Sequence, residues 1–65
     1  MCGNLGRNLR RARLDRKMTQ EEVAERSGVH ATEVSRIESG KRDPQVSTVQ
    51  SLAEAVGLSA SDLLR

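Results

Sequence analysis

A chain of 65 residues is long enough for one small domain but leaves little apolar surface for a large active-site cleft. It contains no Phe, Tyr or Trp, so its core must be aliphatic, and it lacks the aromatic platforms on which single-stranded nucleic acids stack. We therefore expect one domain over residues 1–65 and no RNA partner. No apolar run approaches the roughly 20 residues of a membrane span, and the arginine-rich start lacks the apolar segment of a signal peptide, which predicts a cytoplasmic protein without a membrane partner.

The formal net charge of +2 is distributed unevenly along the chain. Residues 1–18 carry six basic side chains and one acidic one, a local charge of +5, whereas residues 19–40 carry two basic and five acidic ones and residues 41–65 balance. The arginine-rich start either faces a polyanion or is an ordinary solvated helix surface, and the charge pattern leaves both interpretations open.

Apolar residues recur at i, i+4 and i+7 near the start of the chain, which predicts a first helix over about residues 4–16. The inner stripe of this helix consists of Leu5, Leu9 and Ala12. Arg13 falls on the same stripe, and a buried cation without a partner costs several kcal/mol. We expect Arg13 to pair with Glu38, which follows the apolar Ile37.

The segment from Gln20 to Ser39 has small, turning and apolar residues where two helices joined by a tight turn need them. We expect helices over about residues 20–27 and 31–39. Ala24 allows the two helices to cross closely, and Gly28 adopts the left-handed conformation that ends the first of them. This helix-turn-helix pattern makes duplex DNA the first candidate partner.

The ends and faces of these two helices agree with that interpretation. Thr19 followed by Glu22 is a capping box, and Gly40 ends the second helix before a turn at residues 41–44. The side chains expected to bury against the first helix of the pair are Val29, Val34 and Ile37. The outward face of the second helix then carries Ala31, Thr32, Ser35 and Arg36.

Two more helices are predicted over about residues 48–56 and 60–64, with Gly57 ending the first of them. The pairs expected to form capping boxes at their amino ends are Ser47 with Gln50 and Ser59 with Asp62. Four apolar residues of this region are candidates for dimer contacts, or they simply close the core: Val56, Leu58, Leu63 and Leu64.

The residues that could carry catalysis or bind a metal are isolated in the sequence. Cys2 is the only cysteine, so no intrachain disulfide is possible, and we interpret it as incidental. His30 is the only histidine, so no metal or cofactor is expected; it either caps the second helix of the pair or faces a phosphate. Ser35 has no histidine to activate it, and we expect no enzyme and no catalytic residue.

A resemblance to a known family is carried by LRRAR at 9–13, MTQEEVA at 18–24, SGV at 27–29, VSRIESGKRDP at 34–44 and LAEAVGLS at 52–59. In this order the segments resemble the lambda-repressor, Cro and XRE-type helix-turn-helix family over nearly the whole chain. The resemblance implies an all-α, compact five-helix domain that binds double-stranded DNA, usually as a symmetric dimer, and represses or activates transcription.

The resemblance also implies roles for individual residues. It places four residues in the major groove as base readers: Ala31, Thr32, Ser35 and Arg36. The residues expected at DNA phosphates are Gln20, Lys41 and Arg42 from the resemblance, together with Arg10 on the first helix and His30. Arg13 and Glu38 match the family's recurrent interior ion pair.

Two positions depart from the family pattern. Ala31 stands where several relatives carry glutamine, so specificity is expected to depend more on Arg36 and on DNA shape. Ser27 occupies a site that is often apolar, and we expect it to loosen the helix packing slightly.

A bacterial or phage-type transcriptional regulator associated with the nucleoid is therefore expected, most simply a repressor. It would bind as a homodimer to a palindromic operator whose half-sites lie about 34 to 36 Å apart. The alternative is a protein-interaction module of the same fold, or an antitoxin-type protein that binds a partner. An acidic or apolar outward face would mark that alternative, and Thr32 with Arg36 argues against it.

Overall fold

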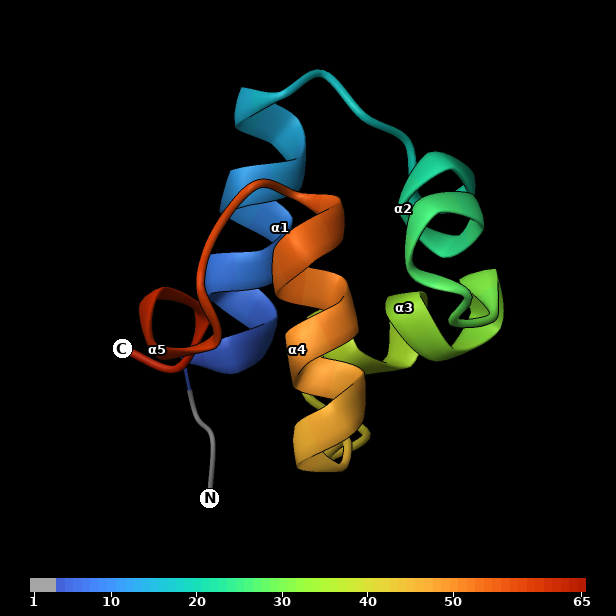
Figure 1. The fold of residues 1–65 in the computed structure, drawn as a ribbon. Helices are drawn as coiled ribbons and strands as arrows, with labels where there is room; N and C mark the ends of the chain where they lie inside the picture. The colour runs from blue at the N-terminus through green and yellow to red at the C-terminus, as the bar shows by residue number, and fades with distance from the viewer. Residues whose placement is uncertain (1–3) are drawn as a thin grey trace.

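A computed structural model describes residues 4–65 of the chain as an all-α domain of 26 × 21 × 19 Å. Its helices are α1 (Leu5–Asp15), α2 (Gln20–Ser27), α3 (Ala31–Glu38), α4 (Val46–Ala55) and α5 (Ala60–Leu63). The helix α4 runs through the middle, with α2 and α3 together on one side and α5 on the other, beside the start of α1 (Figure 1). The predicted five-helix, all-α fold is confirmed.

The core is aliphatic, as the composition requires. All five helices and the segment between α1 and α2 contribute to it, and the buried apolar residues are Leu5, Leu9, Met18, Val23, Val34, Ile37, Val49, Leu52, Ala53, Ala55, Val56 and Leu63. The predicted inner stripe of α1 is confirmed, since Leu5 and Leu9 are buried and Ala12 packs against the cluster. The core therefore fixes how α3 is held against α1 and α2.

Three helices end in the same hydrogen-bonded turn, in which a residue of positive φ reverses the chain. At the ends of α1, α3 and α4 this residue is Lys17 (φ 56°), Gly40 (φ 76°) and Gly57 (φ 75°). The amide that follows Gly40 donates to a carbonyl of α3, from Lys41 N to Arg36 O at 2.9 Å. Gly40 and Gly57 thus end their helices as predicted, while Lys17 adopts a conformation that favours glycine.

A glycine near the start of α1 lets two helices approach closely. Gly6 is buried, and a Cβ there would overlap with the backbone carbonyl oxygens of Ile37 and Glu38. The carboxyl end of α3 therefore lies directly against α1 at Gly6, a residue that the sequence analysis did not single out.

Two of the three predicted capping boxes are present. Glu22 N donates to Thr19 Oγ1 at 3.0 Å and Thr19 N to Glu22 Oε1 at 2.8 Å, and the same reciprocal pair joins Ser59 and Asp62. Hydrogen bonds from the Ser59 hydroxyl and backbone hold the pKa of the Asp62 carboxyl below its usual value.

The prediction for the start of α4 was wrong. The helix begins at Val46, two residues earlier than expected, because Gln45 is extended after Pro44 and its carbonyl accepts from Val49 N at 3.0 Å. Ser47 consequently lies inside the first turn and forms no capping box with Gln50. The early start leaves the Val46 side chain largely exposed.

Candidate nucleic-acid interface

The turn between α2 and α3 is built by Gly28 and Ser27. Gly28 has a φ of 77° and its amide donates to Ala24 O at 2.9 Å, as predicted for the residue that ends α2. Ser27 Oγ accepts from Val29 N at 3.1 Å. The Ser27 hydroxyl thus satisfies a backbone amide that an apolar side chain would leave without this acceptor, and its expected effect on the helix packing remains a prediction.

The helix α3 buries one face and presents the other to solvent. Val34 and Ile37 are almost completely buried, as expected, whereas Val29 is half-buried and packs against the edge of the core. We call the opposite side the reading face, and it consists of Ala31, Thr32, Ser35 and Arg36. Thr32, Ser35 and Arg36 are exposed, whereas Ala31 is half-buried. The Arg36 guanidinium has no ion-pair partner among residues 4–65, so its donors are available for a ligand.

Arg13 and Glu38, the two residues predicted to pair, meet where α1 and α3 cross. Arg13 Nε lies 2.7 Å from Glu38 Oε2 and Nη2 lies 3.0 Å from Oε1, so the contact is two-pronged. Arg13 Nη1 also donates to the carbonyl of Met18 at 2.9 Å. The hydrogen bond to Glu38 raises the pKa of Arg13 although burial opposes the charge. We call this group, with the amide of Gln20, the junction network.

Gln20 has a different partner from the one expected. It is the first residue of α2, where the resemblance places it against a phosphate, but its Nε2 donates to Glu38 Oε1 at 3.2 Å. The side chain is half-buried and joins α2 to the junction network. A phosphate at this end of α2 would therefore be bound by the remaining amide donor or by backbone N–H groups.

His30 directly precedes α3 but does not cap it. Its backbone is in the position of a helix cap, yet its side chain makes no capping hydrogen bond. The capping interpretation was therefore wrong, because the exposed imidazole does not reach the free amides of the first turn. Only the interpretation as a phosphate-facing residue remains.

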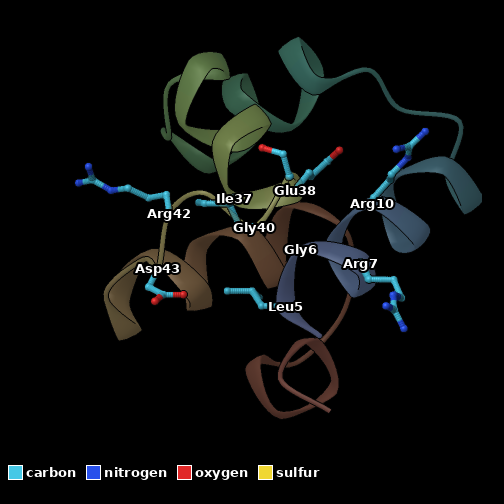
Figure 2. Close-up of a pocket in the computed structure, with 10 residues that line it drawn as sticks. Leu5, Gly6, Arg7, Arg10, Ile37, Glu38, Gly40, Arg42 and Asp43 are labelled. Atoms are coloured by element: carbon cyan, nitrogen blue, oxygen red, sulfur yellow. The ribbon is translucent and has the colours of Figure 1, made fainter. Parts of the chain in front are cut away.

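Two of the residues predicted to bind phosphates, Arg10 and Arg42, line a groove between α1 and the end of α3. The floor of this groove is formed by Leu5, Gly6 and Ile37. Figure 2 shows Arg10 on the α1 side and Arg42 on the opposite side, beyond the turn at Gly40. Further residues that line it and were not singled out from the sequence are Arg7, Ser39 and Asp43.

The two basic residues after Gly40 differ in their partners. Arg42 Nε lies 2.9 Å from Glu33 Oε2, so this arginine is tied to the first turn of α3. Lys41 is exposed and forms no ion pair with any residue from 4 to 65. Sequence reasoning missed Glu33 because nine positions and a chain reversal separate it from Arg42.

Two of the four candidate dimer residues are part of the core instead. Val56 and Leu63 have no exposed surface, so they cannot contact a second chain. Leu58 is half-buried against the core, and Leu64 keeps 47% of its surface exposed.

None of the helices within residues 4–65 combines the length and the apolar character that a membrane span requires.

A helix held by a tight turn, with a buried apolar side and an exposed polar side, is the arrangement of helix-turn-helix DNA-binding proteins. Comparison with known proteins agrees with this class. A family model described as helix-turn-helix, HTH_3, matches residues 9–63. The chain is 42% identical over 60 residues to the uncharacterized HTH-type transcriptional regulator y4dJ of Sinorhizobium fredii, covering 92% of this chain and 78% of that protein. It is also 42% identical over 62 residues to the HTH-type transcriptional repressor RghR of Bacillus subtilis, covering 94% of this chain and 46% of RghR.

Solved structures show the same fold. The restriction-modification controller protein C.AhdI from Aeromonas hydrophila superposes with a TM-score of 0.90 at 27% identity, covering 95% of this chain and 94% of that one. The hypothetical transcription factor NHTF from Neisseria gives 0.92 at 31% identity, covering 98% and 74%. The chain belongs to the HTH_3 helix-turn-helix family, of the XRE, Cro and C1 type, and is a DNA-binding transcriptional regulator rather than an enzyme.

Proposed function

We propose that the protein represses transcription by binding, as a homodimer, to a palindromic operator in duplex DNA. The proposal rests on the exposure of the reading face of α3. Thr32, Ser35 and Arg36 are exposed on a helix whose other side is locked into the core by Val34 and Ile37. A preorganised polar face of this kind suits the major groove, because base edges are read by hydrogen bonds from fixed positions.

Each residue of the reading face has a role that fits its chemistry. Arg36 has parallel N–H donors that match the O6 and N7 acceptors of guanine. Thr32 and Ser35 offer hydroxyl groups to base edges, and the Thr32 methyl group also fits a thymine methyl. Ala31 is half-buried and contributes apolar contact only. Arg36 therefore supplies most of the direct base discrimination.

Phosphate contacts position the reading face without selecting a sequence. Arg10, Lys41 and Arg42 are exposed cations on α1 and on the segment after Gly40. Gln20 and His30 lie at the amino ends of α2 and α3, where free backbone amides attract anions. These five residues form the proposed phosphate-binding set, which also suits a protein that acts on the nucleoid in the cytoplasm.

A dimer is proposed because one helix-turn-helix contacts too few base pairs for tight, specific binding. Two copies related by a two-fold axis place their α3 helices in successive major grooves, about 34 to 36 Å apart. Leu64, with support from Leu58, is the exposed apolar surface at the end of the domain. We assign the dimer contact to this surface.

The test is selection of duplexes from a random DNA library by the purified protein at about 0.15 M salt, followed by sequencing of the bound fraction. The expected result is a palindrome whose half-sites are centred one helical turn apart. The matched control is a variant in which Thr32 and Arg36 are both replaced by alanine, and it should select no pattern. Enrichment of a single unpaired half-site would contradict the dimer, and unpatterned binding by the wild-type protein would contradict the proposed base-reading face.

A further inference from the structure

The contact between Arg42 and Glu33 joins the helix that carries the reading face to the basic segment behind it. Glu33 is the third residue of α3, and Arg42 is the second residue after the turn at Gly40. Their side chains are separated by 2.9 Å, and 57% of Arg42 but only 25% of Glu33 is exposed. A negative charge thus lies within the surface that is expected to approach the anionic DNA backbone.

We propose that Glu33 is an internal counterion for Arg42, which lowers both the affinity of the protein for DNA phosphates and the salt dependence of binding. The proposal deepens the DNA-binding function described above and names a residue that sets its strength. It concerns the backbone contacts alone and does not require a particular operator.

Counterion release makes the binding of a cationic protein to DNA depend on salt. A cation that neutralises a phosphate releases condensed counterions from the DNA, and each such contact adds about 0.9 to the salt slope of binding. Arg42 is already neutralised by Glu33, so its approach to a phosphate brings almost no net charge to the DNA. The carboxylate also repels the phosphate, whether or not Arg42 keeps its contact in the complex.

Glu33 pairs with Arg42 although another arginine lies near it on its own helix. Arg36 is three positions further along α3, a spacing at which opposite charges commonly pair on one helix. The ion pair of Glu33 nevertheless goes to Arg42, and Arg36 has no ion-pair partner among residues 4–65. Glu33 therefore pairs with Arg42, one of the cations of the phosphate-binding set, and leaves the base-reading Arg36 available.

The effect must appear in DNA binding rather than in folding. Ion pairs as exposed as this one contribute little to stability, because solvent screens the charges and the long side chains lose entropy on pairing. The contact with Glu33 is made by Arg42 Nε, and the guanidinium carries further N–H donors on its Nη atoms, so Arg42 can still contact a phosphate. What Glu33 changes is the net charge that this contact contributes.

The test measures binding to a mixed-sequence duplex of about 20 base pairs between about 50 and 200 mM salt. The proteins are the wild type, Glu33→Gln, Arg42→Ala and the double variant, each with its stability checked by urea unfolding. Glu33→Gln should bind about fivefold more tightly at about 0.1 M salt. Arg42→Ala should change the salt slope little in the wild type, but should lower it by about one unit in the Glu33→Gln background.

Two matched controls separate this effect from a general change in charge. Lys41→Ala removes the neighbouring cation, which has no carboxylate partner among the described residues, and it should lower the slope equally in both backgrounds. Glu54→Gln removes an exposed carboxylate from α4 and should strengthen binding less than Glu33→Gln.

The proposal is overturned if Arg42→Ala lowers the slope by the same amount in both backgrounds, or if Glu33→Gln binds no more tightly than Glu54→Gln. Because the duplex has mixed sequence, failure to select a palindrome would count against the proposed operator and leave this measurement unaffected.

Discussion

Two arginine–glutamate pairs in this domain have the same chemistry but opposite surroundings. The side chains of Arg13 and Glu38 are 11% and 5% exposed, and those of Arg42 and Glu33 are 57% and 25% exposed. The first pair is two-pronged and accepts further hydrogen-bond partners from the junction network. The Arg13–Glu38 pair, with Gln20, joins the ends of α1, α2 and α3, whereas the Arg42–Glu33 pair is accessible to a ligand. The first pair is therefore expected to affect folding, and the second to affect DNA binding.

Removing the cation of the Arg13–Glu38 pair should have the largest effect on the free energy of unfolding. Arg13→Ala should lower the free energy of unfolding by about 3 kcal/mol, because the Glu38 side chain, which is only 5% exposed, is left without its cation. Urea unfolding measures the loss, and Arg42→Ala is the matched control, with an expected change below about 1 kcal/mol. Replacing the pair by Arg13→Met with Glu38→Leu should recover most of the stability. Equal unfolding midpoints for the two single alanine variants would contradict the contrast.

The second effect concerns the close approach that brings Glu38 within reach of α1. Gly6→Ala should lower the free energy of unfolding by about 2 kcal/mol, because the added Cβ overlaps with two backbone carbonyls that have little room to move. Gly28→Ala is the control, since no atom lies within 4 Å of its Cβ position and only its positive φ opposes the change, which costs about 1 kcal/mol. A smaller loss for Gly6→Ala than for Gly28→Ala would show that α1 can shift.

The third effect belongs to DNA binding. Arg36→Ala should weaken binding to the selected operator about tenfold, or about 1.4 kcal/mol, while leaving the unfolding curve unchanged. The loss should be smaller on mixed-sequence DNA, because a base contact is lost only where the base is present. Competition between the operator duplex and the mixed-sequence duplex measures the ratio of the two affinities. An equal loss on both would assign Arg36 to the backbone instead of the bases.

Local patterns were sufficient to predict most of the fold and the Arg13–Glu38 pair. The capping boxes at Thr19 and Ser59 depend on residues three positions apart, and the inner stripe of α1 depends on helical spacing. Arg13 could be paired with Glu38 because a charge on a buried stripe needs a partner, and Glu38 was the charge beside a buried residue. Each of these inferences requires little knowledge of how the helices are arranged.

Other features depend on the arrangement itself. The role of Gly6 cannot be predicted without knowing that the end of α3 lies against it. The pairing of Glu33 with Arg42 requires the direction of the chain after Gly40, and the partner of Gln20 requires the position of Glu38. At α4 the spacing of Ser47 and Gln50 suggested a capping box, but the conformation of Gln45 after Pro44 allowed an earlier start. Thr32, Ser35 and Arg36 are exposed as predicted and Ala31 is only half-exposed, whereas the contacts of these residues with bases remain a prediction.

The smallest effect on stability is expected at Lys17, next to the Arg13–Glu38 pair. Lys17 has a φ of 56°, and the turn that it forms is closed by Met18 N donating to Arg13 O at 3.0 Å. Met18 is therefore held where its own carbonyl accepts from the Arg13 guanidinium. Lys17→Gly should raise the free energy of unfolding by about 0.5 to 1 kcal/mol, because glycine adopts this conformation without a clash.

Lys17→Asn is the matched control for this variant, since asparagine also lacks the charge but tolerates the left-handed conformation less well than glycine. Urea unfolding should rank glycine first, asparagine second and lysine last. If lysine were as stable as glycine, its cation would be offsetting the strain through the dipole of α1, and the stability of the wild type should then fall with added salt while that of Lys17→Gly should not. The ranking thus decides whether the turn at Lys17 is held by backbone geometry alone or also by the charge of the lysine.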